Sequence, residues 1–381
     1  MPLSHLKVLE LATILAGPAV GFFLAELGAD VVKVENPRTG GDPTRGWRLG
    51  AELTPDGLSA YYCSVNWGKR SVALDLASAE DLGRFRTLLT QADILLINFK
   101  PGDAEKLGMP LDALLNEHPR LIIGWITGYG PDSARPGFDA LIQAESGFMT
   151  MNGPPGGPAC KLPVALIDLL AAHQLKAALL LGLLERERTG RGRLVEVSLW
   201  KSALSSLINQ ATNVLMNDHD PQPAGTEHPN LFPYGTILEC RDGGVLVAVG
   251  TDRQFDELCA ALGAPELAPE FARNADRTRC RGELREKLQE LAAVLPADDL
   301  LQRLSAGSVP SGRLGSVRQA LESPEAHDLL LAQGGLAALR SVAFSGFGPT
   351  RSLRPPPTLG AHTAEVLGLA KGQQIVHTAV E

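Results

Sequence analysis

The strongest constraint on the fold of this chain lies in its first 35 residues. Residues 6–12 alternate between apolar and polar side chains, as a half-buried strand does. Residues 18–27 then carry apolar side chains at helical spacing and stop at Gly28, a common helix terminator. A second strand follows at residues 29–35. This succession predicts two parallel strands of one sheet, because a helical crossover joins parallel strands.

The alternation of strands and helices continues beyond this unit. Further strands are expected at residues 69–75, 93–98, 120–126 and 193–198, and further helices at residues 77–91 and 169–187. The fold class is therefore α/β, with a Rossmann-like, doubly wound parallel sheet. Ligands of such sheets bind beyond the carboxyl ends of the strands.

A chain of 381 residues is too long for one compact core. The proline-rich stretch 221–229 marks a boundary. Behind it, residues 236–249 predict a β-hairpin with Asp242 and Gly243 at its turn. We expect a large domain at residues 1–205, a linker at 206–229, a small α+β domain at 230–330 and a return segment at 331–381. The return segment is expected to complete the large domain.

Charge, cysteines and hydropathy exclude several classes of protein. A net charge of −8 argues against a nucleic-acid partner. The five cysteines are scattered without a Cys-x-x-Cys pair, and no histidines have metal-ligand spacing, so we expect neither a disulfide framework nor a metal. The start of the chain lacks a signal-peptide pattern, and the apolar stretch 11–25 is too short to cross a membrane. These features predict a cytoplasmic protein without a membrane partner.

The usual catalytic motifs of α/β proteins do not occur in the sequence. There is no Gly-x-x-x-x-Gly-Lys-[Ser/Thr] loop, no Gly-x-Gly-x-x-Gly after the first strand and no Gly-x-Ser-x-Gly elbow. Catalysis by a carboxylate is left as an option.

Asp168 is the one acidic residue in the apolar run 162–172. A lone carboxylate is costly to bury unless something holds it or uses it. It is a candidate helix N-cap, since an aspartate oxygen can accept an amide of the first turn, and it is also a candidate catalytic group. Spacing alone leaves both interpretations open. In either, the helix N-terminus would help to keep the carboxylate ionised.

Short motifs in a fixed order cover nearly the whole chain. They include Val8-Leu-Glu-Leu11, Ala16-Gly-Pro18, Gly41-Asp-x-x-Arg45, Asn66-x-Gly-Lys-Arg70, Asn98-Phe-Lys-Pro-Gly102, Arg135-Pro-Gly-Phe-Asp139, Asp168 and Thr189-Gly-Arg-Gly192. This ordered set resembles the class III CoA-transferases, the CaiB/BaiF family, which includes formyl-CoA transferase. The related α-methylacyl-CoA racemases share the fold and the aspartate.

The resemblance implies that Asp168 is a nucleophile. Its carboxylate would attack an acyl-CoA donor, give a mixed anhydride and then carry CoA as an aspartyl thioester to a carboxylic acid acceptor. CoA and acyl-CoA are then substrates, and no permanently bound cofactor is expected. The oxyanions that form need N–H donors, for which the amides around Ala16 and Gly17 are candidates.

The resemblance also implies two groups of binding residues. Those expected to border the CoA nucleotide are Asn36, Arg38, Lys69, Leu74, Asn98, Phe99, Lys106 and Leu107. Those expected in the substrate pocket are Leu15, Ala16, Phe138, Asp139 and Gln143. Leu15 stands where some members carry a glutamine. Because Leu15 and Phe138 replace polar groups, we expect an apolar pocket.

Two alternative functions are weighed against CoA transfer. A racemase of this family carries a histidine base directly before the residue that matches Asp139, and Phe138 cannot transfer a proton. A CoA-binding protein without turnover is the second alternative, against which the intact Asp168 argues. His173 lies five residues beyond Asp168 on another helix face, so we interpret it as structural.

The resemblance further implies an interlocked homodimer of two ring-shaped chains. The segment 202–229 and the return of the C-terminal part are compatible with this arrangement. Formyl-CoA transferase also has a mobile run of glycines before the small-domain hairpin. Residues 224–230 contain a single glycine, so a lid of that kind is not expected.

Overall fold

A computed structural model describes residues 1–50, 52–347 and 351–369 of the chain. These residues form two compact units. The first unit comprises Met1–Ser146, Leu162–Ile208 and the described part of Glu325–Glu381. The second comprises Gly147–Lys161 and Asn209–Pro324. The first unit is thus built from segments at both ends of the chain.

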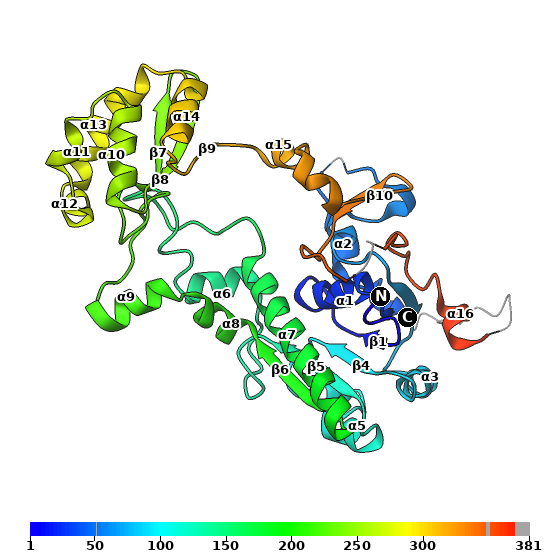
Figure 1. Cartoon of the computed structure of the whole chain (residues 1–381). Coiled ribbons are helices and arrows are strands. Elements are labelled where there is room, and N and C mark those ends of the chain that lie inside the picture. The colour runs from blue at the N-terminus through cyan, green and yellow to red at the C-terminus, as the bar shows by residue number, and fades with distance from the viewer. Residues whose placement is uncertain (51, 348–350, 370–381) are drawn as a thin grey trace. The chain divides into compact units, whose positions relative to one another are not determined.

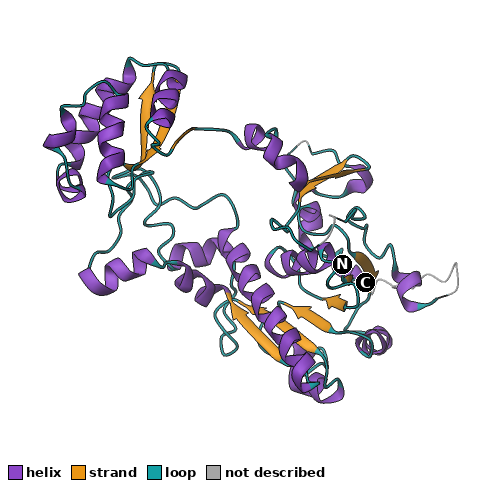
Figure 2. Cartoon of the chain, in the orientation of Figure 1, coloured by secondary structure: helices purple, strands orange, loops and turns teal. Residues whose placement is uncertain are grey.

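A six-stranded parallel sheet is the centre of the first unit (Figures 1 and 2). Its strands are β1 (Lys7–Glu10), β2 (Asp30–Glu35), β3 (Arg70–Ala73), β4 (Ile94–Ile97), β5 (Ile122–Thr127) and β6 (Leu194–Ser198). The spatial order is β3-β2-β1-β4-β5-β6. The expected α/β class and parallel sheet are confirmed. The order of the strands reverses between β1 and β4, where sheets of this kind bind their ligands.

Helices cover both faces of the sheet, as the continuous apolar strands require. The long helices are α1 (Ala16–Glu26), α3 (Ala79–Leu89) and α7 (Leu166–Thr189), and the shorter ones are α2 (Ala60–Cys63), α4 (Asp103–Lys106), α5 (Leu111–Glu117), α6 (Asp139–Glu145) and α8 (Leu199–Ser206). Phe85 of α3 and Leu114 of α5 pack with Leu9 and Leu95 in one core cluster. Helix α7 packs against α1, β5 and β6 (Figure 1).

Helix α7 is long and apolar enough to cross a membrane by length and composition alone. It nevertheless contributes Ala171, Leu175 and Leu179 to the interior of the first unit. Its Arg186 is also buried and forms an ion pair with Asp93 at 3.0 Å. These contacts are those of a core helix.

The second unit is built on a three-stranded antiparallel sheet of order β7-β8-β9. Its elements are β7 (Tyr234–Cys240), β8 (Gly243–Ala248), β9 (Ser311–Arg313), α9 (Asn209–Asn217), α10 (Asp252–Ala261), α11 (Leu267–Glu270), α12 (Asn274–Arg279), α13 (Arg281–Ala293), α14 (Ala297–Ala306) and α15 (Val317–Leu321). The predicted hairpin is confirmed, since Cys240 pairs with Gly243 across the turn. Asp242 accepts the Ala297 amide at 2.7 Å and so ties the turn to α14.

The C-terminal segment returns to the sheet of the first unit. The hairpin of β10 (Leu330–Gln333) and β11 (Leu336–Leu339) packs Leu331 and Leu336 into a cluster with Phe22 and Tyr62. Before α16 (Thr363–Leu367), the His362 amide donates to the Ser71 carbonyl oxygen at 2.9 Å. The segment therefore covers the edge strand β3.

Candidate active site

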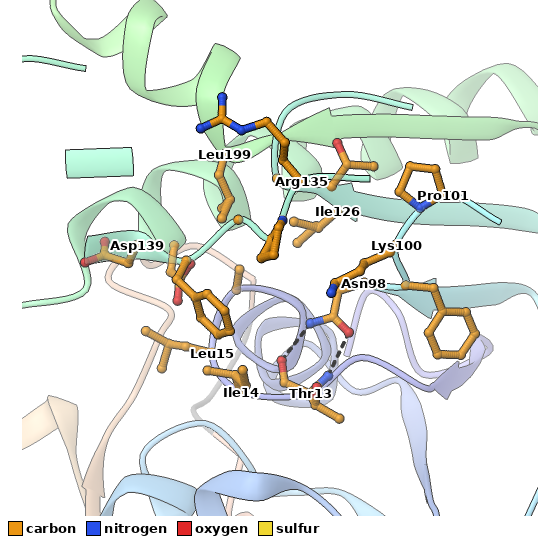
Figure 3. A pocket seen from close by; sticks show the side chains of 18 of the residues that line it. Thr13, Ile14, Leu15, Asn98, Lys100, Pro101, Ile126, Arg135, Asp139 and Leu199 are labelled. Atoms are coloured by element: carbon orange, nitrogen blue, oxygen red, sulfur yellow. Dashed lines mark hydrogen bonds between the residues drawn. The ribbon is translucent and has the colours of Figure 1, made fainter. Parts of the chain in front are cut away.

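A cavity of about 330 Å³ opens at the carboxyl ends of β1, β4 and β5 (Figure 3). It lies where the strand order reverses, as the fold class predicts. Its lining includes Thr13, Ile14, Leu15, Ala16, Asn98, Phe99, Lys100, Ile126, Arg135, Phe138, Asp139, Asp168 and Leu199. Several residues that the motif order separates in sequence therefore share one pocket.

Asp168 lies in the first turn of α7 and is 8% exposed. The helix begins at Leu166 and its N-cap is Ala165, so Asp168 is not the cap. The N-cap interpretation is therefore wrong: the helix starts earlier, at Leu166, where the Asp139 carboxylate accepts the Ile167 amide of its first turn. Asp168 lines the pocket, and its carboxylate accepts no hydrogen bond from any described residue. Its oxygens are free for chemistry.

Asp139, and not Asp168, accepts a hydrogen bond from the first turn of α7. Its Oδ1 accepts the Ile167 amide at 2.8 Å, and its Oδ2 accepts the Gln143 side-chain amide at 2.7 Å. The Gln143 Oε1 in turn accepts the Leu162 amide at 3.0 Å. Both side chains are buried. Helix α6 therefore fixes the segment that leads to Asp168 through a continuous chain of hydrogen bonds.

Burial raises the pKa of Asp168 to about 7, and the negative charge of Asp139 adds to this effect. The helix N-terminus, which we expected to help keep Asp168 ionised, therefore does not hold its pKa in the usual range. Desolvation outweighs the helix dipole, because no amide hydrogen bond holds the charged form. A carboxylate of this basicity is a stronger nucleophile than an exposed aspartate, while a large fraction remains ionised near neutral pH.

The loop between β1 and α1 forms one wall of the cavity. Asn98, directly after β4, donates to the Thr13 carbonyl oxygen at 2.9 Å and accepts the Thr13 amide at 3.1 Å (Figure 3). Leu15 and Ala16 follow and are buried. Asn98, which we expected beside the nucleotide, thus holds the loop that carries these two residues.

A second wall comes from the loop that leads into α6. Gly128 and Gly137 touch so closely that a Cβ on Gly137 would lie 2.2 Å from the Gly128 Cα. Because both residues are glycines, this loop can cross the end of β5. It carries Phe138, which lines the pocket and is 54% exposed.

The residues expected at the nucleotide differ in their availability to a ligand. Phe99 lines the pocket, and the exposed Arg38 and Lys106 lie at the surface, paired with Asp75 and Asp103. Asn36 accepts the Arg38 amide at 2.9 Å and caps the turn Pro37–Thr39, and Leu107 packs partly buried against the core.

Lys69 and Leu74 are buried inside the first unit. The Lys69 Nζ donates to Glu10, Asn66 and the Pro18 carbonyl oxygen, each at 2.9 Å. Burial lowers its pKa to about 8 despite the neighbouring Glu10. The Lys69 ammonium therefore uses its three N–H groups in bonds inside the protein.

Sequence reasoning missed several residues of the pocket. Thr13, Ile14, Lys100 and Arg135 line it but were not among the expected site residues. Their position in the sequence could have indicated this, since Thr13 and Lys100 each lie three residues after the end of a buried strand, and the carboxyl ends of these strands meet at one edge of the sheet. Lys100 and Arg135 also make the pocket less apolar than Leu15 and Phe138 suggested.

Comparison with known proteins agrees with this geometry. Residues 3–363 match the family model described as CoA-transferase family III. The succinate–glutarate CoA-transferase of Agrobacterium fabrum is 35% identical, covering 96% of this chain and 95% of that protein. The human succinyl-CoA:glutarate CoA-transferase is 31% identical, covering 96% of this chain and 85% of that protein.

A solved structure gives the same result. The crystal structure of a CaiB/BaiF family protein from Brucella suis has a TM-score of 0.86 at 35% identity, covering 97% of this chain and 99% of that one. The chain belongs to CoA-transferase family III and is a CoA-transferase.

Proposed function

We propose that this CoA-transferase carries CoA on Asp168. The observation that supports this most directly is a pocket carboxylate that is buried, raised in pKa and bonded to no other described group. Such a group is costly to maintain unless it takes part in the reaction.

The exchange divides into two symmetrical halves. The Asp168 carboxylate attacks the donor thioester, so that a C–O bond forms, the C–S bond breaks, and a mixed anhydride and CoA thiolate result. The thiolate then attacks the aspartyl carbonyl carbon, which releases the donor acid and leaves CoA on Asp168. An acceptor carboxylate attacks this thioester, and the returning thiolate takes the acceptor acyl group from the second anhydride. Atoms and charges balance without a proton transfer.

The pocket walls supply what these steps need. Each attack places negative charge on a carbonyl oxygen, and N–H groups stabilise such an oxyanion. The amides at Ala16 and Gly17 begin α1 beside the pocket, so the helix dipole favours an anion there. The CoA nucleotide would extend from the pocket past Phe99 towards the exposed cations Arg38 and Lys106.

We further propose short dicarboxylic acids as substrates. Two relatives are named for succinate or succinyl-CoA with glutarate, and another, from Haloarcula hispanica, is a succinyl-CoA:mesaconate CoA-transferase. Lys100 and Arg135 line the same pocket as Asp168 and would supply positive charge for a second carboxylate, Arg135 in exchange for its present partner Glu145 at 2.7 Å. This replaces the apolar substrate that Leu15 and Phe138 suggested.

A screen of CoA exchange tests the proposal. Purified enzyme is incubated with succinyl-CoA and single acids of graded length, with and without a second carboxylate. Formation of new acyl-CoA is expected, fastest with dicarboxylic acceptors. Run in heavy water, the reaction should leave the α-carbon undeuterated. Deuterium exchange without CoA transfer would establish the racemase alternative.

The enzyme is further proposed to be an interlocked, ring-shaped homodimer. Leu180, Leu181 and Leu184 leave an apolar strip exposed on α7, with Leu181 66% exposed. In the second unit, Leu215 and Met216 of α9 are also exposed. Exposed apolar faces of this kind support association with a second chain.

A cytoplasmic location is proposed as well. All five cysteines are free thiols, which is typical of a reducing compartment.

A further inference from the structure

Four charged residues form a buried network beneath the pocket wall. Glu10, Lys33 and Lys69 are fully buried and Asp42 is 1% exposed. The Lys33 Nζ lies 3.1 Å from Glu10 and 2.9 Å from Asp42, and the Lys69 Nζ lies 2.9 Å from Glu10. None of the four lines the pocket. Burying so many charges is expensive, so their arrangement calls for an explanation.

Two members of the network hold the backbone between β1 and α1. The Lys33 Nζ donates to the Ala12 carbonyl oxygen at 2.7 Å. The Asp42 carboxylate accepts the Ile14 amide, with its two oxygens 3.3 and 3.2 Å from the nitrogen. One ion pair therefore fixes the loop at two points, two residues apart.

Ile14 has an unusual backbone conformation. Its φ is 73°, in the left-handed region. For a β-branched residue this is an outlier, and it costs roughly 1–2 kcal/mol. Such a conformation persists only where surrounding contacts enforce it. The Asp42 hydrogen bond is the contact that acts on the Ile14 amide itself.

The network also keeps Asp42 able to accept this bond. Burial acts to raise the pKa of Asp42, but the Lys33 charge and the Thr44 hydrogen bonds outweigh it and hold the pKa below its usual value. Thr44 donates to Oδ1 through its amide at 3.0 Å and its hydroxyl at 2.7 Å. Asp42 is thus held as a charged acceptor.

The turn at Ile14 determines where the next amides lie. Leu15 and Ala16 follow directly and line the pocket with Asp168. Leu15, labelled in Figure 3, is the N-cap of α1, and Ala16 is its first residue. Among the described residues, no acceptor is bonded to the amides of Leu15, Ala16 or Gly17. An extended or helical Ile14 would rotate these three N–H groups away from their present direction.

We propose that Asp42, acting through the Ile14 amide, is a positioning residue for the reaction at Asp168. It holds Ile14 in the left-handed conformation and so aims the first amides of α1 at the oxyanions formed during transfer. The inference rests on the proposed function of Asp168 and adds the device that arranges the donors. Asp42 itself touches no substrate.

Three variants test this, namely Asp42→Asn, Ile14→Gly and the two combined. Asn keeps the size of Asp, but both Asp42 oxygens face donors, so in either orientation its NH2 group would meet an N–H or ammonium group of Ile14, Lys33 or Thr44. Asp42→Asn should therefore lower kcat about ten- to a hundredfold. The KM for acyl-CoA should change less than about threefold, because the pocket walls remain. Glycine adopts a left-handed φ without strain. The combined variant should therefore recover at least half of the decrease in log kcat that Asp42→Asn alone causes.

Thr44→Val is the matched control. It removes one hydrogen bond from Asp42 but leaves the bond to Ile14, so kcat should stay within about threefold of the parent. A loss equal to that of Asp42→Asn would show that the network acts only on stability and would overturn the proposal. An unchanged kcat in folded Asp42→Asn would do the same.

A stability comparison keeps the test decisive if Asp42→Asn does not fold. Ile14→Gly and Ile14→Ala both remove the side chain, but only glycine relieves the left-handed φ. The glycine variant should melt at a higher temperature than the alanine variant, the reverse of their usual order. A lower or equal melting temperature would contradict the strain at Ile14. CoA transfer at the parent rate in Asp168→Ala would instead refute the proposed function of Asp168 on which this inference rests.

Discussion

Asp139 accepts the amide that precedes Asp168, at 2.8 Å, and its charge raises the pKa of Asp168. One carboxylate therefore has two effects on the other. It fixes the first turn of the helix on which Asp168 sits, and it makes Asp168 more basic. The N-cap residue Ala165 has no side chain that could cap the helix. The bond from Asp139 takes its place and fixes the position of Asp168, the third residue of α7.

The pH dependence of CoA transfer should follow the ionisation of Asp168. Only the carboxylate attacks, and its pKa is about 7. The first-order rate constant at low acyl-CoA should therefore rise with pH and level off above neutrality. Initial rates measured between about pH 5 and 9 give the midpoint of this rise. A midpoint near the pKa of an exposed aspartate would contradict the burial effect.

Asp139→Asn should move this midpoint to lower pH. Removing the neighbouring negative charge makes ionisation of Asp168 easier, so its pKa falls. The asparagine oxygen can still accept the Ile167 amide, and the helix start is retained. Asp139→Ala, which loses that bond too, should add a loss of kcat of about tenfold. An unshifted midpoint in Asp139→Asn would show that Asp139 does not act electrostatically.

Stability should also report the burial of Asp168. Its folded-state pKa lies above the unfolded value, so the folded protein binds the proton more tightly, and stability declines as pH rises from about 4 to about 7. Asp168→Asn removes this penalty and should stabilise the fold by roughly 2–4 kcal/mol at pH 8, with little effect at pH 4. Urea unfolding at both pH values gives the difference. Equal stabilisation at both would exclude an electrostatic origin.

Selectivity for dicarboxylic acceptors should depend on Lys100 and Arg135 together. The combined variant Lys100→Met and Arg135→Gln should raise the KM for a dicarboxylic acceptor by about tenfold or more. A monocarboxylic acceptor of similar length, which has no second charge to pair, should change by less than about threefold. An equal rise in KM for both acids would indicate that Lys100 and Arg135 bind CoA and not the acceptor.

The exposed strip of α7 should be a subunit contact. Leu181→Glu would place a charge within that contact and shift the protein towards monomer. Arg188→Glu, a charge change at an exposed site of the same helix, serves as the control. Light scattering after gel filtration measures both. A monomeric parent protein, or an unchanged mass for Leu181→Glu, would contradict the assignment.

The sheet was predictable from sequence because its strands are short apolar runs between helical segments. The runs at residues 29–35 and 93–98 each contain the strand that forms, β2 and β4. The expectation that ligands bind beyond the carboxyl ends of the strands follows from the same pattern. Local alternation therefore gives the architecture and the edge where chemistry takes place, whereas the reversal of strand order between β1 and β4 is known only from the structure.

The environment of individual side chains was not predictable. The Asp139–Ile167 bond joins residues 28 apart, and nothing in either local segment signals it. In the sequence, Lys69 resembles a surface cation. In the structure it is buried and bonded to Glu10, which lies 59 positions away in the chain. The pKa of Asp168 likewise depends on burial, which only the assembled fold determines. Long-range packing decides all three.

Covalent catalysis by Asp168 is tested most directly by the mass of the protein itself. The enzyme is mixed with succinyl-CoA without an acceptor acid, quenched in acid and measured intact by mass spectrometry, beside Asp168→Ala. The parent should gain the mass of CoA less one water, and the variant should gain nothing while its transfer rate falls by roughly 10³-fold or more. An adduct that persists in Asp168→Ala, or CoA transfer at the parent rate without Asp168, would contradict the assignment.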